Sequence, residues 1–272
     1  MTTFDSIDHS RTACLLAVLS CAMLALPAAA QSTSRTAAKP TAEPASSWGL
    51  GIAASAARLP YKGYDSKNSA LPLLFYENSW VRFNGASADF KVWRRDFSAG
   101  NSVELAARLK YDPNGYESGD SPFLVGMDER KGGFWGGGAV TWNNSLARVS
   151  GEWLADVSRS SKGQMLQLKV DRRFASGNLA LTPRVQAQWL DAHYVDYYYG
   201  VRAGEARPAR AQYTGQAAVT LEAGVRLDYQ LRPRQTVFLD LSTTSLPKEI
   251  KNSPIVDRSS TSRMTIGYLY RF

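Results

Sequence analysis

The sequence predicts an all-β chain that forms a transmembrane antiparallel up-and-down β-barrel of about 12 strands, with 10 strands as the alternative. Three observations lead to this prediction. Apolar and polar residues alternate with the two-residue period of strands, in runs of about ten residues, the length that a tilted strand needs to cross a bilayer. Tyrosine and tryptophan gather near the ends of the apolar rows, and short connections alternate with long ones.

The clearest alternation lies between Val219 and Leu231. The residues at odd positions are mostly large and apolar, whereas those at even positions include Glu222 and Arg226. In a membrane barrel the apolar row faces lipid and the polar row faces the lumen. A soluble sandwich shows the same alternation, but its strands are typically only about five or six residues long.

Twelve segments fit this pattern in order along the chain. They are residues 48–57, 70–77, 79–86, 88–95, 101–111, 132–142, 146–157, 163–174, 178–191, 214–231, 234–243 and 260–272. The long connections cover residues 112–130, 193–212 and 245–259. An even strand number keeps both ends of the chain on the periplasmic side. Pro183 lies inside one segment and cannot donate a ladder hydrogen bond, so we expect a local bulge there.

The N-terminal region has the composition of a targeting signal. Arg11 precedes an apolar run that ends at Pro27 and three alanines, which predicts a cleaved signal peptide over residues 1–30. A retained membrane anchor and a lipoprotein cut before Cys21 are the alternatives. A flexible periplasmic tail over residues 31–47 and a barrel over 48–272 then follow. Both cysteines, Cys14 and Cys21, lie in the signal, so the exported part has no disulfide.

Charged residues are spread singly along the polar rows, although the formal net charge is +8. The sequence has no Lys/Arg-rich run, and we expect no nucleic-acid partner. Opposite charges on the lumen rows either pair across the lumen and fill it or line a selective pore. The candidate lumen charges are Glu104, Arg108, Glu152, Lys169, Asp171, Arg184, Glu222 and Arg226.

The sequence offers no constellation for catalysis, for a cofactor or for a metal. His193 is the one histidine after the signal, and it lies at the edge of a long connection. The acidic residues of 112–130 do not have the spacing of a calcium loop. We therefore expect no enzyme activity, cofactor or metal. Three loop tyrosines are candidates for protein or glycan recognition, unless they pack into the barrel mouth: Tyr197, Tyr198 and Tyr199.

The C-terminal residues carry the first of several resemblances. Tyr268, Tyr270 and Phe272 resemble the signal by which the barrel-assembly machinery recognises outer-membrane proteins. The chain is further similar to the MipA/OmpV family (MltA-interacting protein) over nearly all of its length after the signal. The segments that carry this similarity are residues 48–51, 59–65, 71–73, 198–201, 253–258 and 267–272.

The family resemblance implies a place in the outer membrane of a Gram-negative cell, in contact with its lipid. It also implies a scaffold or accessory role, with a murein transglycosylase and a penicillin-binding protein as partners in peptidoglycan synthesis or remodelling. The contact regions would be residues 31–47 and the short turns. A small-solute pore and a surface adhesin remain the alternatives, and the family supplies no catalytic residues.

Overall fold

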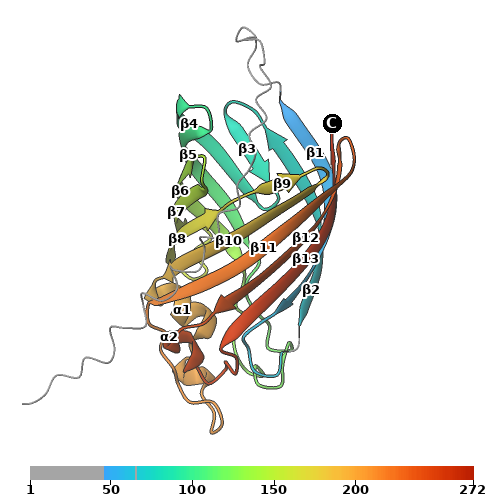
Figure 1. Ribbon diagram of the computed structural model, residues 1–272. Helices are drawn as coiled ribbons and strands as arrows, with labels where there is room; N and C mark the ends of the chain where they lie inside the picture. Colours follow the sequence, from blue (N-terminus) through green and yellow to red (C-terminus); the bar gives the residue numbers. More distant parts are fainter. Residues whose placement is uncertain (1–45, 65) are drawn as a thin grey trace, which may run out of the picture. The chain divides into compact units, whose positions relative to one another are not determined.

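The structure, a computed structural model that describes residues 46–64 and 66–272, contains one closed antiparallel sheet (Figure 1). Apart from β8 and β9, which both pair with β10, strands consecutive in sequence pair with each other, and β1 pairs with β13 to close the barrel. The strands are β1 (Ser47–Arg58), β2 (Lys67–Glu77), β3 (Val81–Asn84), β4 (Ser87–Ser98), β5 (Asn101–Asp112), β6 (Gly133–Asn143), β7 (Arg148–Asp156), β8 (Gln164–Asp171), β9 (Phe174–Ser176), β10 (Leu179–Leu190), β11 (Ala218–Arg232), β12 (Gln235–Ser245) and β13 (Ser260–Arg271).

The predicted fold class and the count of 12 strands are confirmed. β8 and β9 pair with successive parts of the same strand, β10, so the thirteen segments occupy twelve positions in the wall. Each of the twelve expected segments overlaps one of these positions in the wall, and the segment over residues 163–174 overlaps both β8 and β9. The expected signal peptide (residues 1–30) lies outside the described residues, and so does the expected tail (31–47) except for its last two residues.

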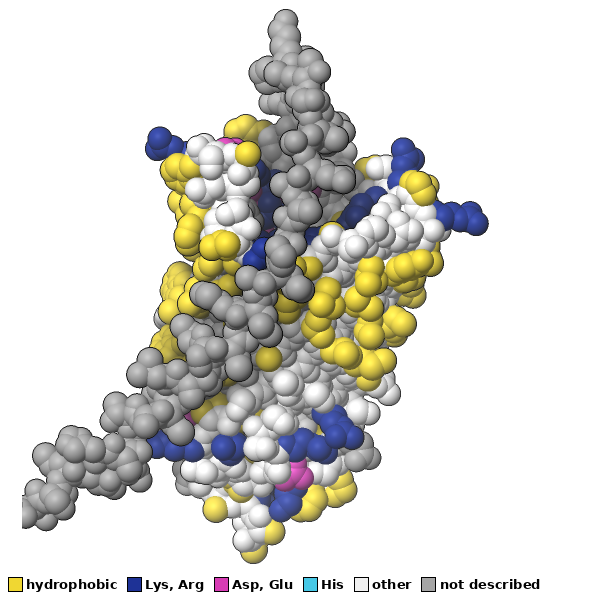
Figure 2. Space-filling model, in the orientation of Figure 1, with side chains coloured by type: hydrophobic (Ala, Val, Ile, Leu, Met, Phe, Trp, Pro, Cys, Tyr) yellow, Lys and Arg dark blue, Asp and Glu magenta, His cyan; other side chains and the backbone are white. Residues whose placement is uncertain are grey.

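The apolar rows face outward, as the alternation predicts. In β11, Val219 and Leu221 are exposed while the intervening Thr220 is buried. Figure 2 shows the result on one face, where hydrophobic side chains gather over the middle of the barrel and lysine and arginine lie toward its two ends. Such a belt matches the hydrocarbon layer of a bilayer.

Exposed aromatic side chains mark both rims of this belt. Tyr111 and Trp189 lie at one rim, and Trp48, Trp142 and Tyr229 lie at the other. Their rings place an apolar body in lipid and a polar edge at the head groups. The aromatic residues that the sequence places near strand ends therefore form two rims on the outer surface of the barrel.

The connections differ in length at the two ends of the barrel. One end, called the turn end, carries the short turns at residues 78–80, 99–100, 144–147, 177–178 and 233–234 together with the C-terminal residue. The other, called the loop end, carries the long connections, and these contain α1 (Ala192–Tyr199), the 3-10 helix η1 (Ala203–Glu205) and α2 (Lys248–Lys251). In outer-membrane barrels the short turns are periplasmic and the long loops extracellular.

The sequence pattern did not predict the two short helices. Asp191 begins α1 as its N-cap and accepts a hydrogen bond from the Tyr194 backbone N–H at 2.8 Å. No helix in the described part of the chain is long and apolar enough to cross a membrane.

One expected strand, over residues 79–86, is shorter than predicted. β3 has four residues, and a two-residue turn at Gly85 and Ala86 leads directly into β4. Only residues 75–77 of β2 pair with β3, so the earlier part of β2 has a strand partner, β1, on one side only. Pro72 lies in this one-sided part, where a missing N–H disturbs no second ladder.

The expectation of a bulge at Pro183 is wrong. The register of β10 runs without a shift past Pro183 on both neighbouring strands. The Pro183 carbonyl still accepts from the Arg172 N–H at 3.3 Å, but proline returns no N–H to that pair. The lost hydrogen bond lies at the two-residue break between β8 and β9. The missing N–H therefore explains why β8 and β9 are separate segments although both keep the same register against β10.

Candidate functional site

A layer of buried apolar and aromatic side chains fills the loop end. Part of the layer consists of inward-facing strand residues near the loop end. The long connections, including α1 and α2, contribute the rest. Its buried members are Tyr61, Tyr116, Leu124, Met127, Trp135, Leu154, Met165, Leu190, Tyr194, Val195, Tyr198, Val201, Ala218, Leu246, Ile250, Ile255 and Val256. These side chains are buried against one another, so the layer fills the inside of the loop end where they lie.

Two buried arginines tie the long connections of this layer together. The Arg130 guanidinium donates to both carboxylate oxygens of Glu205 at 2.9 Å and to the Tyr197 carbonyl at 2.6 Å. Arg210 donates to the carbonyls of Phe123 and Val125 and to that of Glu205. The 113–132 connection is thereby joined to the 191–217 connection by hydrogen bonds that satisfy the buried charges.

Burial also sets the acidity of the groups in this layer. Burial raises the pKa of Tyr116 to about 12 and also raises the pKa of Tyr194 and of Tyr198. For Glu205, burial acts to raise the pKa, but hydrogen bonds from the backbone N–H groups of Arg202 and Asp128 and from Arg130 lower it. The phenols therefore stay neutral and Glu205 stays charged at neutral pH.

The three tyrosines proposed for recognition lie in or against this layer. Tyr198 is buried, its hydroxyl donates to the Lys131 carbonyl at 3.1 Å, and its own carbonyl accepts from the Tyr61 hydroxyl. Tyr197 and Tyr199 are partly buried against the same cluster. These contacts correspond to the alternative that the sequence left open, in which the ring cluster packs into the barrel mouth.

The candidate lumen charges lie on the inward rows and form ion pairs. Arg108 on β5 pairs with Asp89 at 2.6 Å and with Glu152, which Lys110 also reaches. On the other side of the barrel, Arg184 pairs with Glu222 at 3.0 Å and with Asp240 at 2.8 Å. The remaining contacts are Glu104 with Arg82 and Arg94, Lys169 with Asp171, and Arg226 with Asp228.

These pairs run along the wall rather than across the lumen. Arg108 and Asp89 face each other on adjacent strands, and Arg184 reaches Asp240 from two strands away. Sequence reasoning missed Arg82 and Asp89, because they lie in segments where the alternation is weak. Asp240 could have been found, since it stands between Leu239 and Leu241 in a regular row.

A chamber of 570 Å³ opens at the turn end. It is lined by Phe75, Asn84, residues 143–148, residues 171–173, Thr182, Arg226, Asp228, Leu269 and Arg271. Several of these residues come from the short turn between β6 and β7 and from the break between β8 and β9. The chamber is therefore built where the strands meet the periplasmic side.

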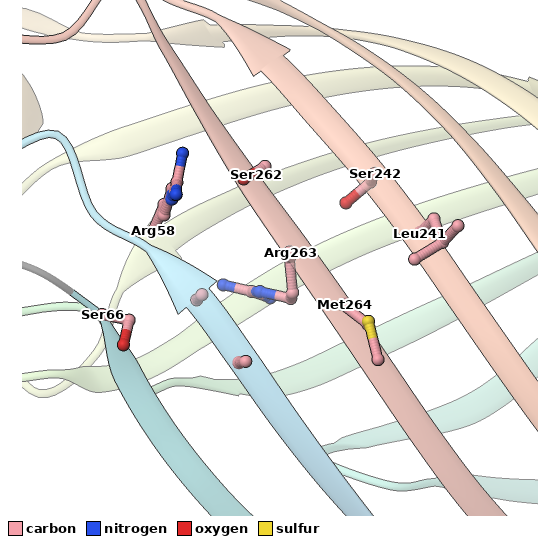
Figure 3. A pocket seen from close by; sticks show the side chains of 9 residues that line it. Arg58, Ser66, Leu241, Ser242, Ser262, Arg263 and Met264 are labelled. Carbon is pink, nitrogen blue, oxygen red and sulfur yellow. The ribbon is translucent and has the colours of Figure 1, made fainter.

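A second, smaller hollow of 410 Å³ lies toward the loop end, beside the end of β1. Figure 3 shows Arg58 and Ser66 next to that strand end, with Arg263 and Met264 on β13 and Leu241 on β12. Among the residues that the structure describes, none in its lining carries a carboxylate. It differs in this respect from the chamber at the turn end.

The remaining candidates for chemistry are dispersed. The His193 side chain is 73% exposed, and its Nδ1 lies 3.4 Å from Asp191. Of the acidic residues in the 112–130 connection, Asp120 accepts from the Glu117 backbone N–H and Asp128 pairs with Arg202. The described residues contain no group of three or more His, Cys, Asp or Glu side chains that could hold a metal ion.

The C-terminal aromatics lie at the turn end. The Phe272 ring stacks on Trp48 with centroids 3.8 Å apart, and Tyr270 meets Phe272 edge-on at 4.9 Å. Tyr270 pairs in register with Leu50, and Tyr268 with Ile52, so these residues lie in the ladder that joins the last strand to the first. Whether these residues also act as an assembly signal stays a prediction.

Comparison with known proteins decides the family. A family model described as MltA-interacting protein MipA matches residues 50–272. The chain belongs to the MipA family. This membership confirms the resemblance found in the sequence.

Two MipA-family relatives come from Escherichia coli K12. The putative outer membrane protein YiaT is 27% identical, over 84% of this chain and 92% of the relative. The MltA-interacting protein is 24% identical, over 82% of this chain and 89% of the relative. Together with the barrel, the printed name of YiaT places the protein in the outer membrane of the cell.

Among solved structures, an outer-membrane channel from Pseudomonas putida F1 is similar with a TM-score of 0.43 and 11% identity. The alignment covers 86% of this chain and 97% of the channel. A likeness at this distance carries no argument about what the MipA-family barrel does.

Proposed function

We propose that this MipA-family barrel is a non-enzymatic scaffold or accessory protein that holds peptidoglycan synthesis and remodelling enzymes at the periplasmic side of the outer membrane. One observation carries the proposal: the two ends of the barrel differ in access. The loop end is filled by a buried layer, whereas the turn end presents an open chamber to the side where the cell wall lies.

The relative named MltA-interacting protein supports the choice of partner. A murein transglycosylase, with a penicillin-binding protein beside it, is the partner class that we propose for this chain. The contact surface would include the turn at residues 144–147 and the rim of the chamber. Arginine is enriched in protein interfaces, and the side chains of Arg148 and Arg173 are about half exposed at this rim.

The test is a pull-down from detergent-solubilised envelopes with an affinity tag inserted within residues 31–46, so that the C-terminal aromatics stay free. Specific recovery of a transglycosylase or a penicillin-binding protein is the expected result. Replacing Leu146, which is exposed at the tip of the 144–147 turn, with Asp should reduce recovery. Replacing the exposed Phe123 at the loop end is the matched control. If the barrel is recovered without either enzyme, the scaffold proposal is wrong.

A surface adhesin is the second candidate, and one observation favours it. Phe123 and Val125 expose apolar side chains on the 113–132 connection at the loop end. Exposed apolar residues on an extracellular loop suit contact with another surface. Phe123→Ser together with Val125→Ser should abolish adhesion of whole cells if this candidate is right, and should leave adhesion unchanged if the scaffold proposal is sufficient.

A further inference from the structure

The chamber at the turn end carries more positive than negative charge. Its lining includes five arginines and two aspartates. The arginines are Arg148, Arg172, Arg173, Arg226 and Arg271, and the aspartates are Asp171 and Asp228. A concave site with an excess of one charge focuses its field on an incoming ion of the other sign.

In this chamber the negative charges are more deeply buried than the positive charges that pair with them. The side chains of Asp171 and Asp228 are only 5% and 11% exposed. Those of Arg148 and Arg173, which pair with them, are 50% and 59% exposed. A ligand entering the chamber therefore meets guanidinium groups first, and the carboxylates lie behind them.

Each carboxylate is already shared between two cations. Asp228 accepts from Arg226 at 2.9 Å and from Arg173 at 3.3 Å. Asp171 lies 2.7 Å from Arg148 and 3.8 Å from the Lys169 ammonium. Arg271 forms no ion pair with any residue that the structure describes. The chamber thus holds guanidinium donors that its own carboxylates do not saturate.

The rest of the lining determines what kind of anion fits. Asn84, Asn143 and Asn144 line it with side-chain amides, and Phe75 and Leu269 supply apolar surface. The Asn144 oxygen already accepts from the backbone N–H groups of Leu146 and Ala147, so this residue offers a ligand its amide donors. Guanidinium groups bind carboxylates through two parallel hydrogen bonds, and side-chain amides match peptide groups. The volume of 570 Å³ lies in the range of about 300–1,000 Å³ that holds small organic ligands.

We infer that the chamber is a binding site for a short acidic peptide that carries at least two carboxylates and enters from the periplasm. The inference deepens the proposed function by naming a ligand class for the turn end, and it rests on that function only for the side of entry. Inorganic phosphate shares the anionic chemistry but not the peptide groups, so the experiment must separate the two.

The experiment is calorimetric titration of the full chain, purified in a non-ionic detergent. The probe is the tetrapeptide Ala-Glu-Ala-Glu with a free C-terminus, and the neutral control is Ala-Gln-Ala-Gln with an amidated C-terminus. We expect the acidic peptide to bind and the neutral one not to bind. Arg173→Gln combined with Arg271→Gln should weaken binding at least about tenfold, since the variant loses two guanidinium groups that can donate charge-assisted hydrogen bonds to the peptide carboxylates.

The matched control is Arg58→Gln, which removes an arginine from the hollow near the loop end and should leave the affinity unchanged. The single change Arg271→Gln breaks no ion pair and keeps the test valid if the double variant fails to fold. Equal binding of both peptides, or unchanged affinity in the variants, would overturn the inference. So would phosphate binding in the chamber without any peptide binding.

The two proposals fail separately. Peptide binding without recovery of a cell-wall enzyme in the pull-down removes the scaffold function and keeps the ligand site. Recovery of the enzyme by a barrel that binds no acidic peptide keeps the scaffold and removes the ligand site.

Discussion

The two ends of the barrel use arginine in opposite ways. At the loop end, Arg130 is almost fully buried, and Glu205 and backbone carbonyls take its hydrogen bonds. At the turn end, Arg148 and Arg173 are half exposed and cover carboxylates that lie behind them. A guanidinium buried among its own partners fixes a conformation, whereas one that faces water is available to a ligand.

The difference follows from what each end must do. The loop end has to hold long connections in one arrangement, and buried charges tolerate few alternatives to that arrangement. The turn end needs no such fixing, because its connections are mostly two to four residues long. The four predictions below test this contrast, beginning with the largest expected effect.

Removing the carboxylate partner at the loop end should have the largest effect. Glu205→Ala leaves Arg130 charged and buried without its partner, a change that typically costs about 3–5 kcal/mol. Hydrogen exchange of the loop amides measures the free energy of local opening. The control Asp128→Asn breaks an exposed pair with Arg202 and should cost about 1 kcal/mol or less. Equal effects of the two changes would contradict the contrast.

A methyl group at Gly215 should displace α1. A Cβ on Gly215 would overlap the backbone of Val195 and Asp196, and the Gly215 N–H already donates to the Asp196 side chain at 2.8 Å. Gly215→Ala should cost about 1–3 kcal/mol in the same exchange measurement. A Cβ on Gly204 would meet nothing within 4 Å, so Gly204→Ala is the control, and it should leave exchange near α1 unchanged.

At the turn end, replacing Phe272 or Trp48 distinguishes the packing of the two rings from recognition of the C-terminus by the barrel-assembly machinery. Replacing either ring with alanine removes the stacked pair of Trp48 and Phe272, worth about 0.5–1.5 kcal/mol, and Phe272→Ala also removes the edge contact with Tyr270. If Phe272 also serves as an assembly signal, Phe272→Ala should slow barrel assembly in cells more than Trp48→Ala does. Heat-modifiable migration of pulse-labelled protein follows this assembly. Equal delays would assign the effect to stacking alone.

The smallest effect is spectroscopic. Because the raised pKa of a phenol favours its neutral form in the folded state, the stabilisation is complete below the usual pKa of about 10 and is lost as pH rises through the folded value. For Tyr116 that value is about 12. Phenolate absorbance should therefore show a late-ionising class in the native protein, and Glu205→Ala should shrink this class by loosening the layer. A single ionisation near pH 10 would contradict the buried layer.

Particular residues show how far sequence reasoning reaches. Strand alternation placed Glu104, Arg108, Arg184 and Glu222 on inward rows, because side chains of a strand must alternate between two faces. It could not choose their partners, since Asp89 and Asp240 come close only through strand register. It also expected a bulge at Pro183, where the ladder keeps its register and simply omits one hydrogen bond.

The sequence by itself determined the barrel, its twelve strands, the faces of those strands and the family. The barrel, the strand number and the strand faces depend on periodicity and connection length, which are local in the chain. The family depends instead on the resemblance of short sequence segments to those of known members. Only the tertiary structure decided that one end is filled and the other forms a basic chamber. Arg130 meets Glu205 from 75 positions away, and the chamber unites residues from β2 to β13. Contacts over such separations depend on how the sheet closes, which no local pattern specifies.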